Sequence, residues 1–181
     1  MNNPFYMYPY YSNTYYSNGP MCNHDNMSYG RGYANQYWSY PNTQGYTSPI
    51  LNDHGKEPFV VNINQSARQN NTFRTAIWTG DNLQVTLMSI NVGEDIGLEV
   101  HPDVDQFLRI EEGQGFVQVG ESRDQLNFVK YVHDDSAIMV PAGMWHNLTN
   151  TGNIPLKLYT IYAPPEHPFG TVHRTKADAE G

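Results

Sequence analysis

The sequence predicts an all-β domain, built as a sandwich or a closed barrel, behind a disordered N-terminal tail. Three observations lead to this expectation. From residue 51 onward, short runs rich in Val, Ile, Thr, Phe and Tyr alternate with Gly, Asn and Asp. No stretch carries the sustained 3.6-residue apolar period of a packed helix. The composition changes near residue 50 and the chain has no internal repeat, so we expect one barrel over residues 51–170 and a polar tail over 171–181.

The tail, residues 1–50, is rich in Tyr, Asn, Ser, Gly and Pro. It holds eleven of the fourteen tyrosines, and only Asp25 and Arg31 are charged between residues 1 and 49. Leu and Val are absent from those residues. A segment with almost no aliphatic side chains cannot offset its ordering entropy by burial. We therefore expect a disordered, low-complexity tail, which either tethers and solubilises the barrel or associates with other chains.

Ten runs are expected to be strands, and residues 63–71 are also compatible with a short helix. Turn residues separate several of them, such as Gly113 before one strand and Pro141-Ala142-Gly143 before another. The expected strands are Phe59–Ile63, Thr72–Trp78, Gln84–Asn91, Gly97–His101, Gln106–Glu111, Gly115–Val119, Leu126–Val132, Ser136–Val140, Trp145–Asn150 and Leu156–Tyr162.

Polar side chains with metal-ligand chemistry gather at two places in these strands. Glu99 and His101 are two residues apart, so in a strand they point to the same side. Gln106 opens the next strand after a short bend and can point back at them. His146 lies early in another strand. If both strand pairs line one interior, four donors converge on rigid elements, which is what a metal site needs.

At this point the chain resembles the cupins, whose first motif is G-x5-H-x-H-x(3,4)-E-x6-G. Here the motif begins at Gly93 and has five residues before Glu99. His101 follows at the spacing of the second histidine, Gln106 at that of the glutamate, and Gly113 closes the motif.

The second cupin motif, G-x5-P-x-G-x2-H-x3-N, is matched in spacing as well. It starts at Asp135, continues with Pro141 and Gly143, and ends with His146 and Asn150. The resemblance spans residues 58–165 and implies a single jelly-roll β-barrel. The parity of the strands makes the rest of the interior mostly apolar.

The departures from the motifs change the implied ligand set. Glu99 stands where the family usually has its first histidine, and Gln106 where it has its glutamate. The resemblance then implies metal ligands Glu99, His101, Gln106 and His146, with Gln106 as a weaker ligand or a partner of a bound water. Two imidazoles and one carboxylate suit one divalent ion of Mn, Fe, Ni, Co or Zn. Asp103 is expected at the mouth, and a cupin that has lost its metal is the alternative.

Three functions stay open. The first is a metal-dependent enzyme on a small organic molecule, such as a carbohydrate, of the isomerase, epimerase or dioxygenase type. In it Glu99 is a metal ligand or, if unligated, the catalytic general base. The second is a binding cupin without turnover. The third is a structural protein, similar to spore-coat proteins, in which the tyrosine-rich tail mediates association.

The basic residues of the predicted strands limit the substrate. A sugar phosphate, as taken by cupins similar to mannose-6-phosphate isomerase, needs Arg or Lys near the cavity. Only Arg74, Arg109, Lys130 and Lys157 lie in predicted strands, and Arg109 and Lys157 have outward parity. A sugar-phosphate isomerase is therefore not supported by visible chemistry.

Charge and composition limit the kinds of binding partner and the cellular setting that we expect. A net charge of −8 argues against nucleic acid and anionic membranes. The single cysteine, Cys22, allows no internal disulfide and fits a cytoplasmic setting, with a spore coat or other surface layer as the alternative. We expect no membrane span and no signal peptide. The resemblance implies a homodimer, for which Phe128, Tyr131 and the Tyr159–Tyr162 strand are interface candidates.

Overall fold

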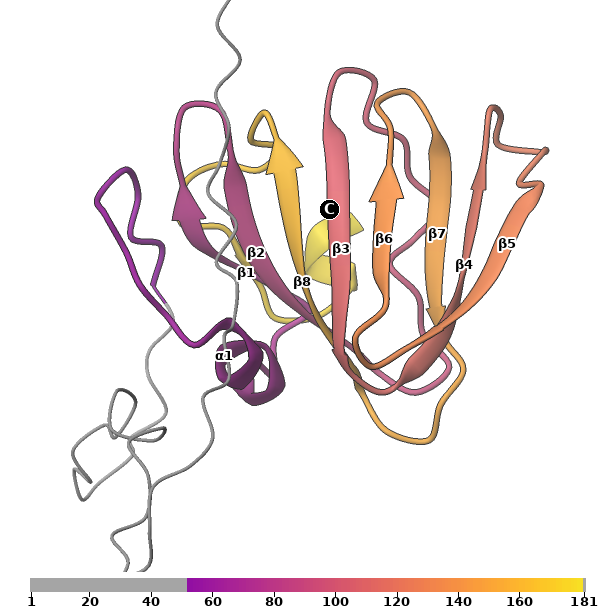
Figure 1. The fold of residues 1–181 in the computed structure, drawn as a ribbon, viewed down its shortest axis with the longest axis horizontal. Helices are drawn as coiled ribbons and strands as arrows, with labels where there is room; N and C mark the ends of the chain where they lie inside the picture. The colour runs from indigo at the N-terminus through magenta and orange to yellow at the C-terminus, as the bar shows by residue number, and fades with distance from the viewer. Residues whose placement is uncertain (1–51, 181) are drawn as a thin grey trace, which may run out of the picture. The chain divides into compact units, whose positions relative to one another are not determined.

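The computed structural model describes residues 52–180, and they form two antiparallel β-sheets that face each other (Figure 1). The larger sheet has the strand order β6-β3-β8-β2-β1-β9, and the smaller has the order β5-β4-β7. This confirms the predicted all-β barrel. The predicted disordered tail, residues 1–50, lies outside the described residues. The strands are β1 (Arg74–Thr79), β2 (Gln84–Ile90), β3 (Asp105–Glu112), β4 (Gln114–Gly120), β5 (Phe128–His133), β6 (Ala137–Val140), β7 (Trp145–Asn150), β8 (Leu156–Ala163) and β9 (Val172–His173).

The interior of the larger sheet consists of rungs of cross-strand neighbours from β2, β8 and β3. Directly opposed residues in antiparallel strands share a face, so each rung points to one side. One rung is apolar and consists of Met88, Leu158 and Ile110. The next rung along the strands consists of Thr86, Thr160 and Leu108. The third is polar and consists of Gln84, Tyr162 and Gln106. Polarity therefore rises along the same strands toward one end of the barrel.

The smaller sheet supplies the opposite wall. On β7 the residues at alternate positions, His146, Leu148 and Asn150, are buried, as the predicted parity requires. Leu148 joins the main hydrophobic core together with Leu108 and Ile110. His146 thus lies at the polar end of the interior, two residues along β7 from Leu148 of the apolar core.

The predicted strand Gly97–His101 is not a regular strand. The chain there runs antiparallel to β7 but pairs only at isolated bridges, Asp95 with Thr149 and Glu99 with His146. Gly97 has a φ of 89°, a left-handed conformation that interrupts a strand. Glu99 nevertheless sits in register with His146, because each exchanges a backbone hydrogen bond with the other, at 3.0 and 2.9 Å.

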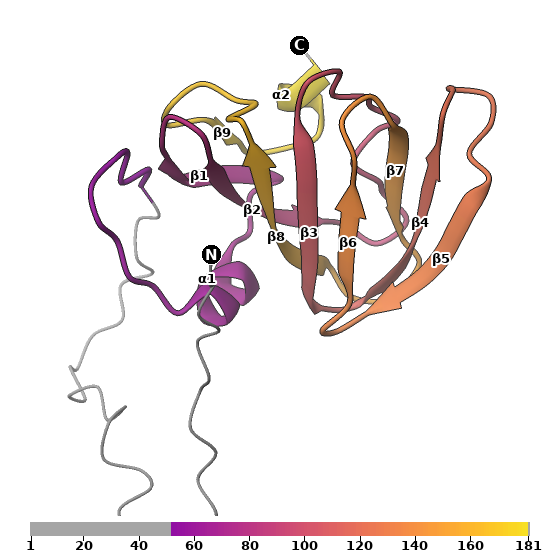
Figure 2. The ribbon, with the colours of Figure 1, turned by 45° about the horizontal axis from the view of Figure 1, so that its top comes forward.

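The predicted strand Phe59–Ile63 is wrong as well. Helix α1 (Ile63–Gln69) begins at the end of that run, and the Asn62 side chain caps it by accepting a hydrogen bond from the Gln65 backbone N–H at 3.0 Å. The helix packs on the outer face of the larger sheet, where Ala67 lies with Ile77 and Leu87 in a small second core (Figure 2).

The C-terminal segment, for which a polar tail was predicted, contains two short elements. Strand β9 pairs with β1 at the edge of the larger sheet, with His173 opposite Arg74. Helix α2 (Ala177–Glu180) follows, and Lys176 just before it forms an ion pair with Asp95. Long-range pairing that composition does not reveal therefore orders this segment.

The aromatic residues suggested for an interface divide into two groups. Phe128 and Tyr131 on edge strand β5 are 53 % and 85 % exposed. Tyr162 is fully buried and faces the interior, so it cannot contribute to an interface. No helix among residues 52–180 is long and apolar enough to cross a membrane.

Candidate metal centre

Glu99, His101 and His146 come together at the polar end of the barrel. Glu99 Oε1 lies 3.4 Å from His101 Nε2 and 3.3 Å from His146 Nε2. One ligand atom from each of the three residues lies within 4.8 Å of the other two. Glu99 and His101 come from the segment before β3, and His146 comes from β7. The backbone bridge between Glu99 and His146 brings these two elements into contact.

The two imidazoles are held by hydrogen bonds on their far side. His101 Nδ1 lies 3.1 Å from Glu166 Oε1, and His146 Nδ1 lies 3.1 Å from the Met144 carbonyl oxygen. A carboxylate or carbonyl at Nδ1 requires the proton there, which leaves Nε2 as a lone-pair donor. Both Nε2 atoms then face Glu99 ready to bind a cation.

The facing atoms have no hydrogen-bond partner. Glu99 Oε1, His101 Nε2 and His146 Nε2 are all buried and unsatisfied. Buried polar atoms are nearly always paired, so three unpaired acceptors in one place indicate a missing donor or cation. The chemistry of the donor set therefore fits a metal ion.

Gln106 lies opposite Tyr162 on the neighbouring strand, and the Tyr162 ring lies 5.6 Å from the ring of His101. The Gln106 side chain is 3 % exposed, and its Nε2 donates to Thr160 Oγ1 at 3.3 Å. The amide nitrogen is thus directed at β8, and Oε1 is left buried without a partner. An amide oxygen is a weak, neutral ligand, so Gln106 offers a fourth donor from the opposite sheet.

The electrostatics of the cluster favour a cation. Burial acts to raise the pKa of the Glu99 carboxyl, but the adjacent His101 and His146 rings, when protonated, and then the positive charge of Arg74 lower it to about 2. Burial also acts to lower the pKa of His101, yet Glu99 and Glu166 raise it above its ordinary value. At neutral pH Glu99 is ionised, and the site attracts positive charge.

Access to the cluster is through Glu99. Its side chain is 24 % exposed, whereas those of His101 and His146 are 8 % and 2 % exposed. Three protein ligands leave further coordination positions for water or another small molecule. The arrangement could therefore bind a metal and expose it on one side.

Sequence reasoning missed several residues around the cluster. Glu166 and His167 lie in the loop after β8, and this loop is fastened where His167 and Gln84 hydrogen-bond twice, at 2.9 Å each. Arg74 and Tyr162 face the interior from β1 and β8. Tyr162 could have been predicted to face the interior, because it pairs with Gln106 on the neighbouring strand. No motif pointed to Glu166. Asp103, expected at the mouth, is exposed and outside the cluster.

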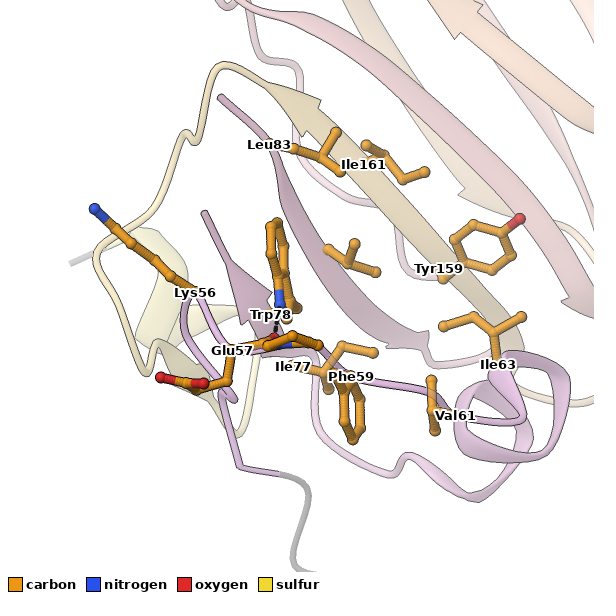
Figure 3. A pocket seen from close by; sticks show the side chains of 12 residues that line it. Lys56, Glu57, Phe59, Val61, Ile63, Ile77, Trp78, Leu83, Tyr159 and Ile161 are labelled. Atoms are coloured by element: carbon orange, nitrogen blue, oxygen red, sulfur yellow. Dashed lines mark hydrogen bonds between the residues drawn. The ribbon is translucent and has the colours of Figure 1, made fainter. Parts of the chain in front are cut away.

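A separate groove lies on the outer face of the larger sheet (Figure 3). It has a volume of about 590 Å³ and contains none of the cluster residues. Phe59, Trp78 and Ile161 are among its mostly apolar lining residues, and the Trp78 indole N–H donates to the Glu57 carbonyl at 2.9 Å. Lys56 and Glu57 lie among the groove's lining residues, but within residues 52–180 it holds no group of metal ligands, so we place the candidate functional site at the cluster.

Two antiparallel sheets around a group of one carboxylate and two imidazoles define a small β-barrel protein with a candidate metal site in its interior. Comparison with known proteins identifies the family within this class. A family model described as "Cupin domain" matches residues 86–162. The uncharacterised protein YrkC of Bacillus subtilis (strain 168) is 71 % identical over 130 residues, which cover 72 % of this chain and 70 % of that protein. The chain therefore belongs to the cupin family.

Solved structures agree with this assignment. BH2720 from Bacillus halodurans is 65 % identical and superposes with a TM-score of 0.71, covering 72 % of this chain and 98 % of that one. A Klebsiella pneumoniae protein with a double-stranded β-helix domain is 18 % identical, with a TM-score of 0.51 and coverage of 65 % and 98 %. The second likeness shows the fold alone.

Proposed function

We propose that this protein is a metal-binding cupin that holds one divalent ion and takes a small organic molecule beside it. Glu99, His101 and His146 would be the ligands, with Gln106 as a fourth, weaker oxygen ligand. The observation that carries this proposal is the convergence of three buried, unpaired acceptor atoms around Glu99 Oε1. The hydrogen bonds at both Nδ1 atoms support it, because they orient the imidazoles as metal ligands commonly are.

Two imidazoles with one carboxylate suit Fe, Mn, Co, Ni or Zn as divalent ions. The ligand set has a formal charge of minus one, since the imidazoles and the amide are neutral. A bound ion with an open position would supply Lewis-acid or oxygen-activating chemistry. Turnover of the isomerase, epimerase or dioxygenase type is compatible with such a site, and the fold does not choose among them.

The test is metal content by ICP-MS on untagged full-length protein. Wild type is compared with His101→Ala/His146→Ala and with His133→Ala, which removes an exposed histidine outside the cluster. We expect nearly one ion per chain in wild type and in His133→Ala, and none in the double variant.

Thermal unfolding supplies a second readout. At a free-metal concentration a hundred times Kd, binding stabilises the folded state by about 2.7 kcal/mol. A chelator should therefore lower the Tm of wild type and leave that of the double variant unchanged. Wild type that stays metal-free after reconstitution, or equal metal in all three proteins, would exclude the proposed site.

A further inference from the structure

Beyond the metal cluster, the barrel interior holds a second set of buried polar atoms without a hydrogen-bond partner. They come from the larger sheet and from the loop after β8. They are Arg74 Nε, Thr86 Oγ1, Tyr162 Oη, His167 Nε2 and His173 Nδ1. Native interiors pair nearly all such atoms, so a concentration of them beside a candidate metal site indicates a space for a polar ligand.

Arg74 is the charged member of this set. It is opposite Met88 of the main core on one side and opposite His173 on the other, so it shares the interior face. It is 4 % exposed, and among residues 52–180 it forms no ion pair with a carboxylate. The guanidinium carbon lies 5.5 Å from the centre of the Phe73 ring. The charge on Arg74 acts on the ionised Glu99 at a distance, but no described carboxylate pairs with the guanidinium directly. A buried guanidinium without a direct partner is costly, so an anionic ligand beside it would be stabilised.

A row of rings connects Arg74's neighbours to the metal cluster. The His101 and Tyr162 ring centroids are 5.6 Å apart, Tyr162 and His167 are 5.0 Å apart, and His167 and His173 are 6.3 Å apart. A ligand beside Tyr162 therefore lies next to a proposed metal ligand. The charge on Arg74 also acts on Tyr162 and on Glu99, so the guanidinium lies near the same end of the interior.

The protonation states of these rings favour a ligand that accepts hydrogen bonds. The Tyr162 hydroxyl is buried and unpaired, and a phenol can donate a hydrogen bond. Burial and then the charge on Arg74 lower the pKa of His167 to about 3, and they also lower that of His173. Both imidazoles are neutral at pH 7, which leaves Arg74 as the positive charge of the set.

We propose that Arg74 and Tyr162 bind the carboxylate of a small organic acid whose other oxygen group reaches the cluster of Glu99, His101 and His146. This inference rests on the proposed function and names its substrate class. A monoanionic carboxylate matches the single guanidinium and its planar fork of donors. A phosphate dianion would place two charges on the one group that faces this guanidinium and would need a second cation there. Lys157 does not supply one, since its ammonium donates to the Asn70 carbonyl and to Asn71 Oδ1.

The test measures binding of malonate and of its uncharged analogue malonamide by isothermal titration calorimetry. Full-length protein is used, both loaded with the metal it retains and after chelator treatment. Arg74→Gln removes the charge at similar length, and Arg74→Lys keeps it without the fork. Lys130→Gln, on the exposed side of β5, is the control for the same change in net charge. ICP-MS of each variant reports the metal site separately.

We expect malonate to bind wild type and Lys130→Gln at least tenfold more tightly than malonamide. Arg74→Gln should lose at least tenfold in malonate affinity and keep its metal content, and Arg74→Lys should lie between. Equal binding of malonate and malonamide, or unchanged malonate affinity in Arg74→Gln, would overturn the carboxylate site.

Two further outcomes separate this inference from the proposed function. Arg74-dependent malonate binding by wild type that takes up no metal even after reconstitution supports the carboxylate site and refutes the metal site. If Arg74→Gln does not fold, Tyr162→Phe takes its place, because it removes only one buried, unpaired hydroxyl. A loss of fivefold or more in that variant supports the proposal, and unchanged affinity overturns it.

Discussion

The two ends of the barrel interior are built by the same strands and differ in chemistry. Leu158 and Tyr162 are four residues apart on β8, share the interior face and are both fully buried. Leu158 packs between Met88 and Ile110, whereas the Tyr162 hydroxyl has no partner. Burial alone therefore does not say what a residue contributes. The apolar end offsets the entropy of folding, and the polar end holds buried polar groups that have no partner within the described part of the protein.

The largest change in stability is expected from a substitution at the apolar end of the interior. Leu158→Ala should lower the free energy of unfolding by about 2–5 kcal/mol, since it removes a fully buried side chain and leaves a cavity. Urea denaturation measures this change. Val129→Ala on exposed β5 is the control and should stay within about 0.5 kcal/mol of wild type. The folded fraction of Leu158→Ala should keep its metal content, and loss of metal there would contradict the separation of the two ends.

A smaller effect is expected at the polar end. Glu166→Gln weakens the carboxylate that holds His101 Nδ1 at 3.1 Å. Metal affinity, measured by competition with a chelator, should fall about 10–100-fold, as is usual when such a supporting partner is changed. The stability of the metal-free protein should hardly change. Glu121→Gln, on an exposed residue before β5, is the control. Equal affinities in the two variants would show that Glu166 does not support the ligand.

The smallest effect concerns the segment that carries Glu99. Burial acts to raise the pKa of Asp95, but Lys176 and the Gly97 backbone N–H, at 2.8 Å, lower it below its ordinary value. A carboxyl with a lowered folded-state pKa stabilises the protein above its unfolded pKa. That contribution is lost as the pH falls through the lower folded value.

Asp95→Asn should therefore be less stable than wild type at pH 7, by about 0.5–1 kcal/mol, because the ion pair with Lys176 is partly exposed. The difference should shrink as the pH is lowered from about 5 to about 3. Unfolding curves at several pH values check this. A gap that stays constant with pH would mean that the ion pair does not contribute.

Several features of the fold were predictable because they depend on local pattern. Period-2 alternation located the strands from β1 to β8 within a few residues, and it placed Leu108 and Leu148 inside. The strand over Gly97–His101 failed because its backbone at Gly97 is left-handed. The run Phe59–Ile63 failed because Asn62 caps a helix there instead.

The candidate site, too, was predictable only in part from local pattern. Glu99, His101 and His146 were selected from motif spacing, and the structure brings them together, although their role as ligands stays a prediction. Gln106 is buried nearby with its oxygen unpaired. The predicted tail and the functions attached to it lie outside the described residues.

By itself the sequence determined the class of barrel and the residues that would meet at its polar end, because strand alternation and motif spacing act over a few residues. Only the tertiary structure decided which other groups join them. Arg74 belongs to β1, and Glu166 and His167 belong to the loop after β8, so all three lie outside both motifs in sequence. Their positions follow from strand register and from the contacts of Gln84 with the loop after β8, and these depend on packing across the whole barrel.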